Sequence, residues 1–259
     1  ELDVKFSDSN IDAFGRLRIS FPYTLFQNDH INGIDNFQMD QKTNNSTITY
    51  ISQDSTVDLN INTAGSGNYA IYQSREYLKY QPGKSLLIIL TGVLNSGNAN
   101  GDNTYSRLGY FDDDNGVFFE YYQNKLYVVK RSNTSGSVVE TKIEQKKFNN
   151  NRAMDLDLSK SQIFFMDIEW LGVGTVSYGV IRDRKLVYLH FLHNDNRETT
   201  TYMATSNLPI RYEIRSLSTS KGLGKLKAMC SSVLSEGGYE LIGRPFSVGN
   251  NVTTVGVTT

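Results

Sequence analysis

The sequence has few cysteines, few prolines, no long apolar run and no excess of one charge. Its single cysteine, Cys230, excludes an intramolecular disulfide and argues against a cysteine-based zinc site. The longest strongly apolar run, LLIIL at 86–90, is far shorter than the roughly 18 to 20 residues that cross a bilayer, so no membrane partner is expected. The 26 basic residues are balanced by 27 acidic ones, so nucleic acid is not an expected partner either.

Aromatic and β-branched residues are abundant, and they occur in short alternating blocks. The chain contains 16 Tyr and 13 Phe, and Gly, Asn, Asp and Ser separate the blocks. The continuous apolar run at 84–94 predicts a strand buried on both faces. The alternating blocks are 46–52, 56–62, 69–80, 107–111, 117–122, 125–132, 137–145, 163–171, 175–183, 185–193, 210–217 and 225–234.

This pattern predicts an all-β chain folded as an antiparallel β-sandwich of the jelly-roll or concanavalin-like type. Because no linker interrupts the alternating blocks, residues 41–235 are expected to form one sandwich domain. Residues 1–40 lack a clean period and are predicted to form an extended N-terminal arm. Residues 236–259 are rich in Gly, Asn and Thr, and we expect them to be a C-terminal extension that continues beyond the sequence given.

One strand carries a pair of carboxylates on one face. In IFFMDIEW, strand alternation places Asp167 and Glu169 on the same side. Sandwich glycosidases use acids presented in this way, one as proton donor and one as nucleophile. The third acid of their usual pattern is replaced by Phe165, so the alternative is that both acids face water or pair with arginines.

The segment FDDDNG (111–116) predicts a hairpin, because Asn-Gly tolerates the positive φ values of a tight turn. Asp112, Asp113 and Asp114 are weak candidates for a cation site, because oxygen ligands beside a turn suit calcium. The spacing of a calcium-binding loop is absent, so a solvated hairpin tip is the alternative, and neither a metal nor a cofactor is expected. Cys230 lies in an apolar strand pattern and is predicted to be a buried, inert thiol.

Tyrosine supplies rigid, amphipathic contact area that suits sugar-binding surfaces. Tyr110 and Tyr122, interpreted as loop tyrosines, are the candidate ligand-binding residues. The segment FFEYYQNKLYVV (118–129) is apolar on both faces, so one face either meets another subunit or is covered within a central strand.

The segment DAFGRLRISFPYTLF (12–26) is aromatic and arginine-rich but has no strand period. Apolar anchors and bidentate arginines are typical of an assembly arm, whereas an extra strand on the sandwich is the alternative. The predicted interface residues are Phe14, Arg16, Leu17, Arg18, Phe21, Tyr23 and Phe26.

Together with KYQPGKSLLIILTGVL, RLGYFDDDNGVFFEYY, FFMDIEWLGVGTVSYGVI and LPIRYEIRS, this segment resembles virion structural proteins of tailed phages and large double-stranded DNA viruses. Their Ala-Phe-Gly-Arg-Leu-Arg motif matches residues 13–18 here. The resemblance implies a non-enzymatic fibre, spike or minor component of the virion, with no catalytic residues to carry over. It also implies other virion proteins as partners, a homo-oligomer such as a trimer, and a role in host attachment through a surface glycan. Two alternatives stay open: a lectin-like carbohydrate-binding module, and a glycoside hydrolase that uses Asp167 and Glu169.

Overall fold

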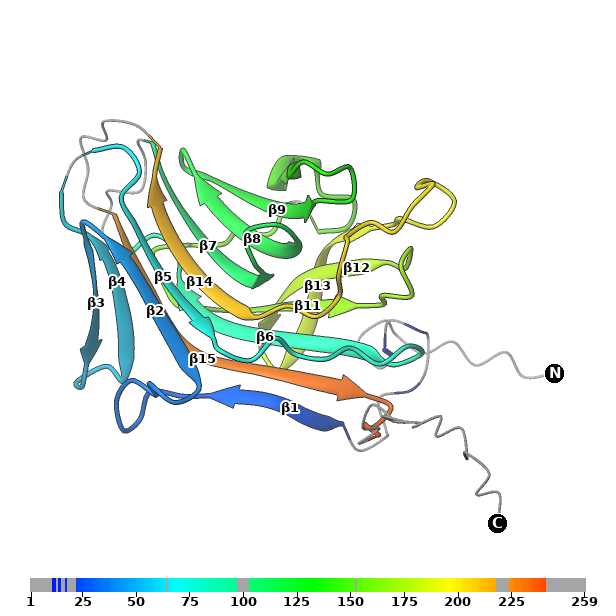
Figure 1. Cartoon of the computed structure of the whole chain (residues 1–259), viewed down its shortest axis with the longest axis horizontal. Coiled ribbons are helices and arrows are strands. Elements are labelled where there is room, and N and C mark those ends of the chain that lie inside the picture. The colour runs from blue at the N-terminus through cyan, green and yellow to red at the C-terminus, as the bar shows by residue number, and fades with distance from the viewer. Residues whose placement is uncertain are drawn as a thin grey trace, which may run out of the picture.

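The computed structural model describes residues 11–12, 14, 17, 22–63, 65–96, 103–151, 153–217 and 224–240. These residues form two antiparallel sheets packed face to face, which confirms the predicted β-sandwich (Figure 1). The one helical element in this part of the chain is a 3-10 turn at Gln145–Lys147. None of the described residues forms a helix with the length and apolar character needed to cross a bilayer.

The first sheet has the strand order β13-β12-β11-β6-β15-β4-β3, and β1 pairs with β15 beside this path. Its strands are β1 (Tyr23–Asn28), β3 (Ser46–Ile51), β4 (Thr56–Ile61), β6 (Ser85–Val93), β11 (Gln162–Ile168), β12 (Val176–Arg182), β13 (Lys185–Leu192) and β15 (Lys225–Glu236). The second sheet has the order β10-β9-β8-β7-β14-β5-β2. Its strands are β2 (Met39–Asn44), β5 (Tyr69–Ser74), β7 (Thr104–Phe111), β8 (Gly116–Tyr122), β9 (Lys125–Ser132), β10 (Val139–Glu144) and β14 (Ile210–Ser216).

Strand β6 is central, between β11 and β15, and it is buried on both faces as the apolar run predicts. Leu86, Ile88 and Leu90 point between the sheets into the main core, whereas Leu87 belongs to a separate cluster on the outer face. A strand with neighbours on both sides and side chains packed above and below has no face that needs polar residues, which is why its sequence does not alternate.

Tyrosine hydroxyls join the two sheets across the core. Tyr178 of the first sheet donates a hydrogen bond to the carbonyl oxygen of Val129 in the second, at 2.9 Å. Tyr212 of the second sheet donates to the carbonyl oxygens of Thr91 and Cys230 in the first. Because a buried hydroxyl without a partner is costly, these contacts fix where each ring can sit. Much of the tyrosine content therefore serves the core.

The N-terminal boundary of the sandwich lies earlier than the predicted residue 40. Strand β1 pairs antiparallel with the end of β15, so the alternative of an extra strand is correct for this part of the predicted arm. Phe26 is 5% exposed within the main core, and Met39 at the start of β2 is 1% exposed. In Figure 1, β1 and β15 run together along the lower edge of the molecule. The pattern was missed because β1 carries a register shift between Thr24 and Phe26, which breaks the alternation.

Cys230 also differs from the prediction, because it is exposed rather than buried. The register between β15 and β6 shifts between Ala228 and Ser231. A bulge of this kind inserts residues that no longer alternate with the rest of the strand, so the side chain of Cys230 turns out of the core.

Candidate functional site

The outer face of the second sheet, which points away from the main core, carries a ladder of charged side chains. In the β14 sequence IRYEIRS, Ile210, Tyr212 and Ile214 point into the core, so Arg211, Glu213 and Arg215 point outward. Register places Arg107 of β7 opposite both Glu213 of β14 and Glu120 of β8. The ladder therefore arises from strand alternation in three neighbouring strands.

Arg107 is the centre of this ladder, with a side chain only 4% exposed. Its Nε donates to Glu120 Oε2 at 2.7 Å, and its Nη2 donates to Glu140 Oε2 at 3.2 Å. Its Nη1 lies 3.6 Å from Glu213 Oε1. Glu120 is fully buried, and a buried carboxylate is tolerated only when it is paired and hydrogen-bonded in this way.

The network extends from Arg107 in two directions. Towards β10, Arg131 donates two hydrogen bonds to Glu140 Oε1, at 3.0 and 2.7 Å, and Lys142 donates to both oxygens of Glu120. Towards the β7–β8 turn, Arg211 Nη1 lies 2.7 Å from Asp113 Oδ1 and 3.2 Å from Glu213 Oε2. We call this connected set the charged network. Its members are Arg107, Asp113, Glu120, Arg131, Glu140, Lys142, Arg211, Glu213 and Arg215.

The guanidinium groups of the network also cover an aromatic layer on the same face. Phe111, Phe118 and Val129 form a small buried cluster there. The guanidinium of Arg131 lies 5.1 Å from the ring centre of Phe118, and that of Arg107 lies 3.8 Å from the ring centre of Tyr105. The two-sided apolar segment 118–129 is therefore central and covered within its own chain, as one of its two interpretations stated.

A hollow opens on this face above the network. It has a volume of ≈ 530 Å³, and strands β7, β9, β10 and β14 and two connecting loops supply its walls. The lining residues are Tyr105, Asp113, Arg131, Val138, Glu140, Glu213 and Arg215. Carboxylates, guanidinium groups and a tyrosine in one hollow can offer both donors and acceptors to a polar ligand.

The electrostatics of the hollow favour ionised carboxylates. Burial alone would raise the pKa of Glu140, but Arg107 and Arg131 outweigh burial and hold this pKa at about 2. Burial likewise opposes ionisation of Asp113, and its hydrogen bond with Arg211 still lowers its pKa below the usual range. Both groups are therefore hydrogen-bond acceptors at neutral pH and hold no proton to donate.

The predicted carboxylate pair lies on the first sheet, away from this hollow. Asp167 points to the outer face, opposite Ser177 and Leu87, and is 1% exposed. Glu169 follows the end of β11, where its Oε2 accepts a hydrogen bond from the backbone N–H of Thr175 at 3.3 Å. Asp167 is too buried to reach a polysaccharide, and Glu169 supports a turn.

The three acids of the predicted cation site point in different directions. Asp112 Oδ1 accepts hydrogen bonds from the backbone N–H groups of Asp114 and Asn115, which closes the β7–β8 turn. Asp113 pairs with Arg211, and Asp114 accepts a hydrogen bond from Asn133 Nδ2. Across the described ranges, no three His, Cys, Asp or Glu side chains group as a metal site would require. The segment forms the expected hairpin turn, with its acids engaged by the protein.

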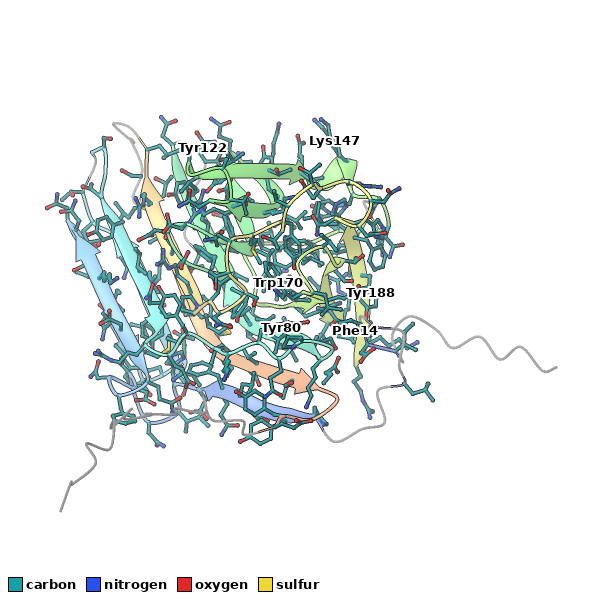
Figure 2. All side chains as sticks on the ribbon, turned by 45° about the vertical axis from the view of Figure 1, so that its right-hand side comes forward. Phe14, Tyr80, Tyr122, Lys147, Trp170 and Tyr188 are labelled. Atoms are coloured by element: carbon teal, nitrogen blue, oxygen red, sulfur yellow. The ribbon has the colours of Figure 1, made fainter. Side chains whose placement is uncertain are left out.

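The two candidate ligand-binding tyrosines differ in their surroundings. Tyr110 is 1% exposed, and its hydroxyl donates to the carbonyl oxygens of Leu78 and Ser206, so its prediction as a ligand contact is wrong. Tyr110 faces inward because it alternates with Arg107 and Gly109. Tyr122 is half-buried at the end of β8 (Figure 2). Gln123 Nε2 donates a hydrogen bond to its hydroxyl.

The predicted interface residues separate into three groups. Phe26 belongs to the core, so it cannot anchor a partner. Tyr23 is 42% exposed and stacks on Tyr239 with ring centres 5.2 Å apart, while Phe14 and Leu17 are half-buried. Arg16, Arg18 and Phe21 lie outside the described residues.

The charged network was missed at the sequence level. The available signal is the run Arg-x-Glu-x-Arg on one face of 210–217, and by itself this run predicts only a strand. Its partners Arg107 and Glu120 lie in other strands, and a single sequence does not give the order of strands in a sheet.

No protein-family model and no curated protein sequence matches this chain. Among solved structures, the chain is similar to an endo-1,3-beta-glucanase from Streptomyces sioyaensis, with a TM-score of 0.55 and 8% identity over 83% of this chain and 96% of that chain. It is also similar to the Emp47p carbohydrate recognition domain, with a TM-score of 0.52 and 9% identity over 83% of this chain and 96% of that chain. At these identities the likenesses establish a shared lectin-like β-sandwich fold.

Proposed function

We propose that this chain is a non-enzymatic, carbohydrate-binding β-sandwich that holds its ligand in the hollow above the charged network. The observation that carries the proposal is the hollow itself, which has ionised acceptors, guanidinium donors and Tyr105 in its walls. Sugar hydroxyls both donate and accept hydrogen bonds, so they match such a lining. The lectin-like fold shared with the Emp47p domain is consistent with this role as an analogy.

A binding role is favoured over hydrolysis by the state of the carboxylates. A glycosidase needs one carboxyl group with a raised pKa to donate a proton to the leaving group. The pKa of Glu140 is instead about 2, and Glu120 and Glu213 are bound by arginines. We therefore expect no hydrolysis of a broad polysaccharide panel.

A glycan array followed by titration calorimetry tests the proposal, with a matched pair of variants. Val138 lines the hollow and is 46% exposed, whereas its neighbour Val139 is 55% exposed and lines a different pocket beside Thr141 and Tyr202. We expect Val138→Trp to fill the hollow and abolish binding, and Val139→Trp to leave it unchanged. If the unmodified protein binds no glycan, the proposal is refuted. If only Val139→Trp loses binding, the glycan binds in the pocket beside Thr141 and Tyr202 instead of in the hollow.

A second candidate function, a structural component of a virion, is favoured by where the two flanks meet. Tyr23 and Tyr239 stack on each other, and β1 pairs with the end of β15, so both flanks of the sandwich lie together on the first sheet. The hollow lies on the outer face of the opposite sheet. Anchoring through the flanks would leave the hollow directed outward, as host attachment requires.

Light scattering on the full chain and on a chain that begins at residue 22 tests this second role. The cut at residue 22 keeps β1, which the sandwich needs. We expect a homo-oligomer, such as a trimer, that dissociates into folded monomers when residues 1–21 are removed. A full chain that is monomeric at all concentrations would count against an assembly role.

A further inference from the structure

Arg215 differs from the other cations of the charged network. Each of Arg107, Arg131, Lys142 and Arg211 donates at least one hydrogen bond to a network carboxylate. Arg215 donates none within the described part of the chain. Its closest charge contact is the 3.6 Å separation of its Nε from Glu213 Oε1. The two terminal nitrogens of its guanidinium are thus left for another partner.

The network also carries more positive than negative charges. Its cations are Arg107, Arg131, Lys142, Arg211 and Arg215, and its carboxylates are Asp113, Glu120, Glu140 and Glu213, so one positive charge is in excess. In a partly desolvated site an uncompensated charge attracts an ion of opposite sign more strongly than it would in water. Arg215 and Lys142 are the accessible cations, with side chains 35% and 36% exposed, but Lys142 is already held by Glu120 and Glu140. Arg215 is therefore the cation that an added ligand can reach and pair with.

The neighbours of Arg215 are aromatic rings. Register places it between Tyr105 of β7 and Tyr69 of β5, and its guanidinium lies 5.1 Å from the ring centre of Tyr69. This contact with the Tyr69 ring limits where the guanidinium can lie, and a guanidinium held in position presents a two-pronged donor edge. That edge matches the two oxygens of a carboxylate.

We infer that the ligand of the hollow is an acidic sugar whose carboxylate pairs with Arg215. This inference rests on the proposed carbohydrate-binding function and specifies its ligand class. The more accessible carboxylates of the lining, Asp113 and Glu140, whose side chains are 72% and 21% exposed, then accept hydrogen bonds from the sugar hydroxyls. A sugar that carries a carboxylate both neutralises the excess charge and uses the unoccupied donors.

Calorimetry with matched ligands tests the inference. The probes are 3′-sialyllactose, a glucuronate-terminated disaccharide, the methyl ester of each, and a sulfated lactose. We expect at least one acid to bind about tenfold more tightly than its ester, because a hydrogen bond to a charged group contributes that much. The affinity for that acid should fall as NaCl rises, whereas the affinity for the ester should not.

Variants of Arg215 locate the effect. Arg215→Gln should weaken binding of the acid about tenfold, to the level of the ester, and leave the ester unchanged. Arg215→Lys should give an intermediate affinity, because it keeps the charge but loses the two-pronged edge. The control is Arg184→Gln, which makes the same charge change on the exposed β12–β13 turn of the first sheet and should have no effect.

Three results would overturn the inference while leaving the proposed function standing. These are equal affinity for acids and esters, selective binding of the sulfated lactose, and equal loss of acid and ester binding in a folded Arg215→Gln variant. Binding of no saccharide at all, acidic or neutral, would instead remove the proposed function itself. Thermal unfolding of each variant verifies that the fold is intact.

Discussion

The outer faces of the two sheets each carry a cluster of buried side chains, an apolar cluster on the first sheet and a charged one on the second. On the first sheet, Phe165 and Tyr188 meet edge to face with ring centres 5.2 Å apart, beside Leu87. On the second sheet, the corresponding layer is the charged network around Arg107. The hydrophobic effect is not directional, so an apolar face does not fix the orientation of a bound molecule. A charged face fixes donors and acceptors in space, so the second sheet is the better place for a specific ligand.

The largest expected effect comes from removing the centre of the charged face. Arg107→Met leaves Glu120 and Glu213 buried without their shared cation, and breaking a buried pair in this way costs about 3–5 kcal/mol. Urea unfolding of the variant measures this loss.

The control for this change is the double variant Arg107→Met with Glu120→Gln, which removes one of the stranded charges. It should recover part of the lost stability. If the free energy of unfolding of Arg107→Met alone lies within about 1 kcal/mol of that of the unmodified protein, the network is solvated. The two outer faces would then not differ in the way described.

A smaller effect is expected on the apolar face, where Phe165 lies against Gly179. A Cβ atom at residue 179 would sit 2.3 Å from Phe165 Cζ and 2.4 Å from the backbone carbonyl oxygen of Val187. Gly179→Ala should therefore destabilise the protein by about 1–3 kcal/mol through overpacking. Urea unfolding of the single variant and of the double variant with Phe165→Leu makes the measurement. The smaller side chain should relieve the part of the clash that the ring causes and leave the part that the Val187 carbonyl causes. If the two changes are simply additive, the ring does not pack on residue 179 as described.

The smallest expected effect is the pH dependence that Glu140 gives to the charged face. The folded-state pKa of Glu140, about 2, is below its ordinary value of 4.5, so its contribution is present above pH 4.5 and is lost as the pH falls towards 2. Because this group is partly solvated, we expect a loss of about 1 kcal/mol over that range. The unmodified protein should be more stable to unfolding than Glu140→Gln at pH 5, and this difference should shrink at pH 2.5. If the variant loses as much unfolding free energy between pH 5 and pH 2.5 as the unmodified protein does, other carboxylates cause the loss.

The sequence predicted most of the sandwich, because its signals are local. The β9 block at 125–132 coincides with the strand, and the alternation of 210–217 correctly separates core from outward residues. Strands β1 and β2 were missed, since β1 contains a register shift and β2 has the polar sequence MDQKTN at a sheet edge. The prediction that Cys230 is buried was wrong because the register of β15 shifts between Ala228 and Ser231.

The candidate site was beyond reach of the sequence for a different reason. The residue type of Tyr110 and its expected place in a loop predicted a ligand contact, whereas its hydroxyl donates to the carbonyl oxygen of Leu78 inside the core. Asp167 and Glu169 were chosen because they share a strand, whereas the network joins acids and bases from different strands. For chemistry assembled across strands, the spacing along the chain shows at most one strand's share, such as Arg-x-Glu-x-Arg in β14, and does not show its partners in other strands.

The sequence by itself determined that this chain forms paired, antiparallel layers, because the two-residue period and the turn residues act between near neighbours. The tertiary structure decided that β8, β7 and β14 lie side by side, and only this order brings Glu120, Arg107 and Glu213 into contact. Strand order is set by the packing of the whole molecule, so the burial of these charges, and the hollow they line, has no counterpart in any one segment.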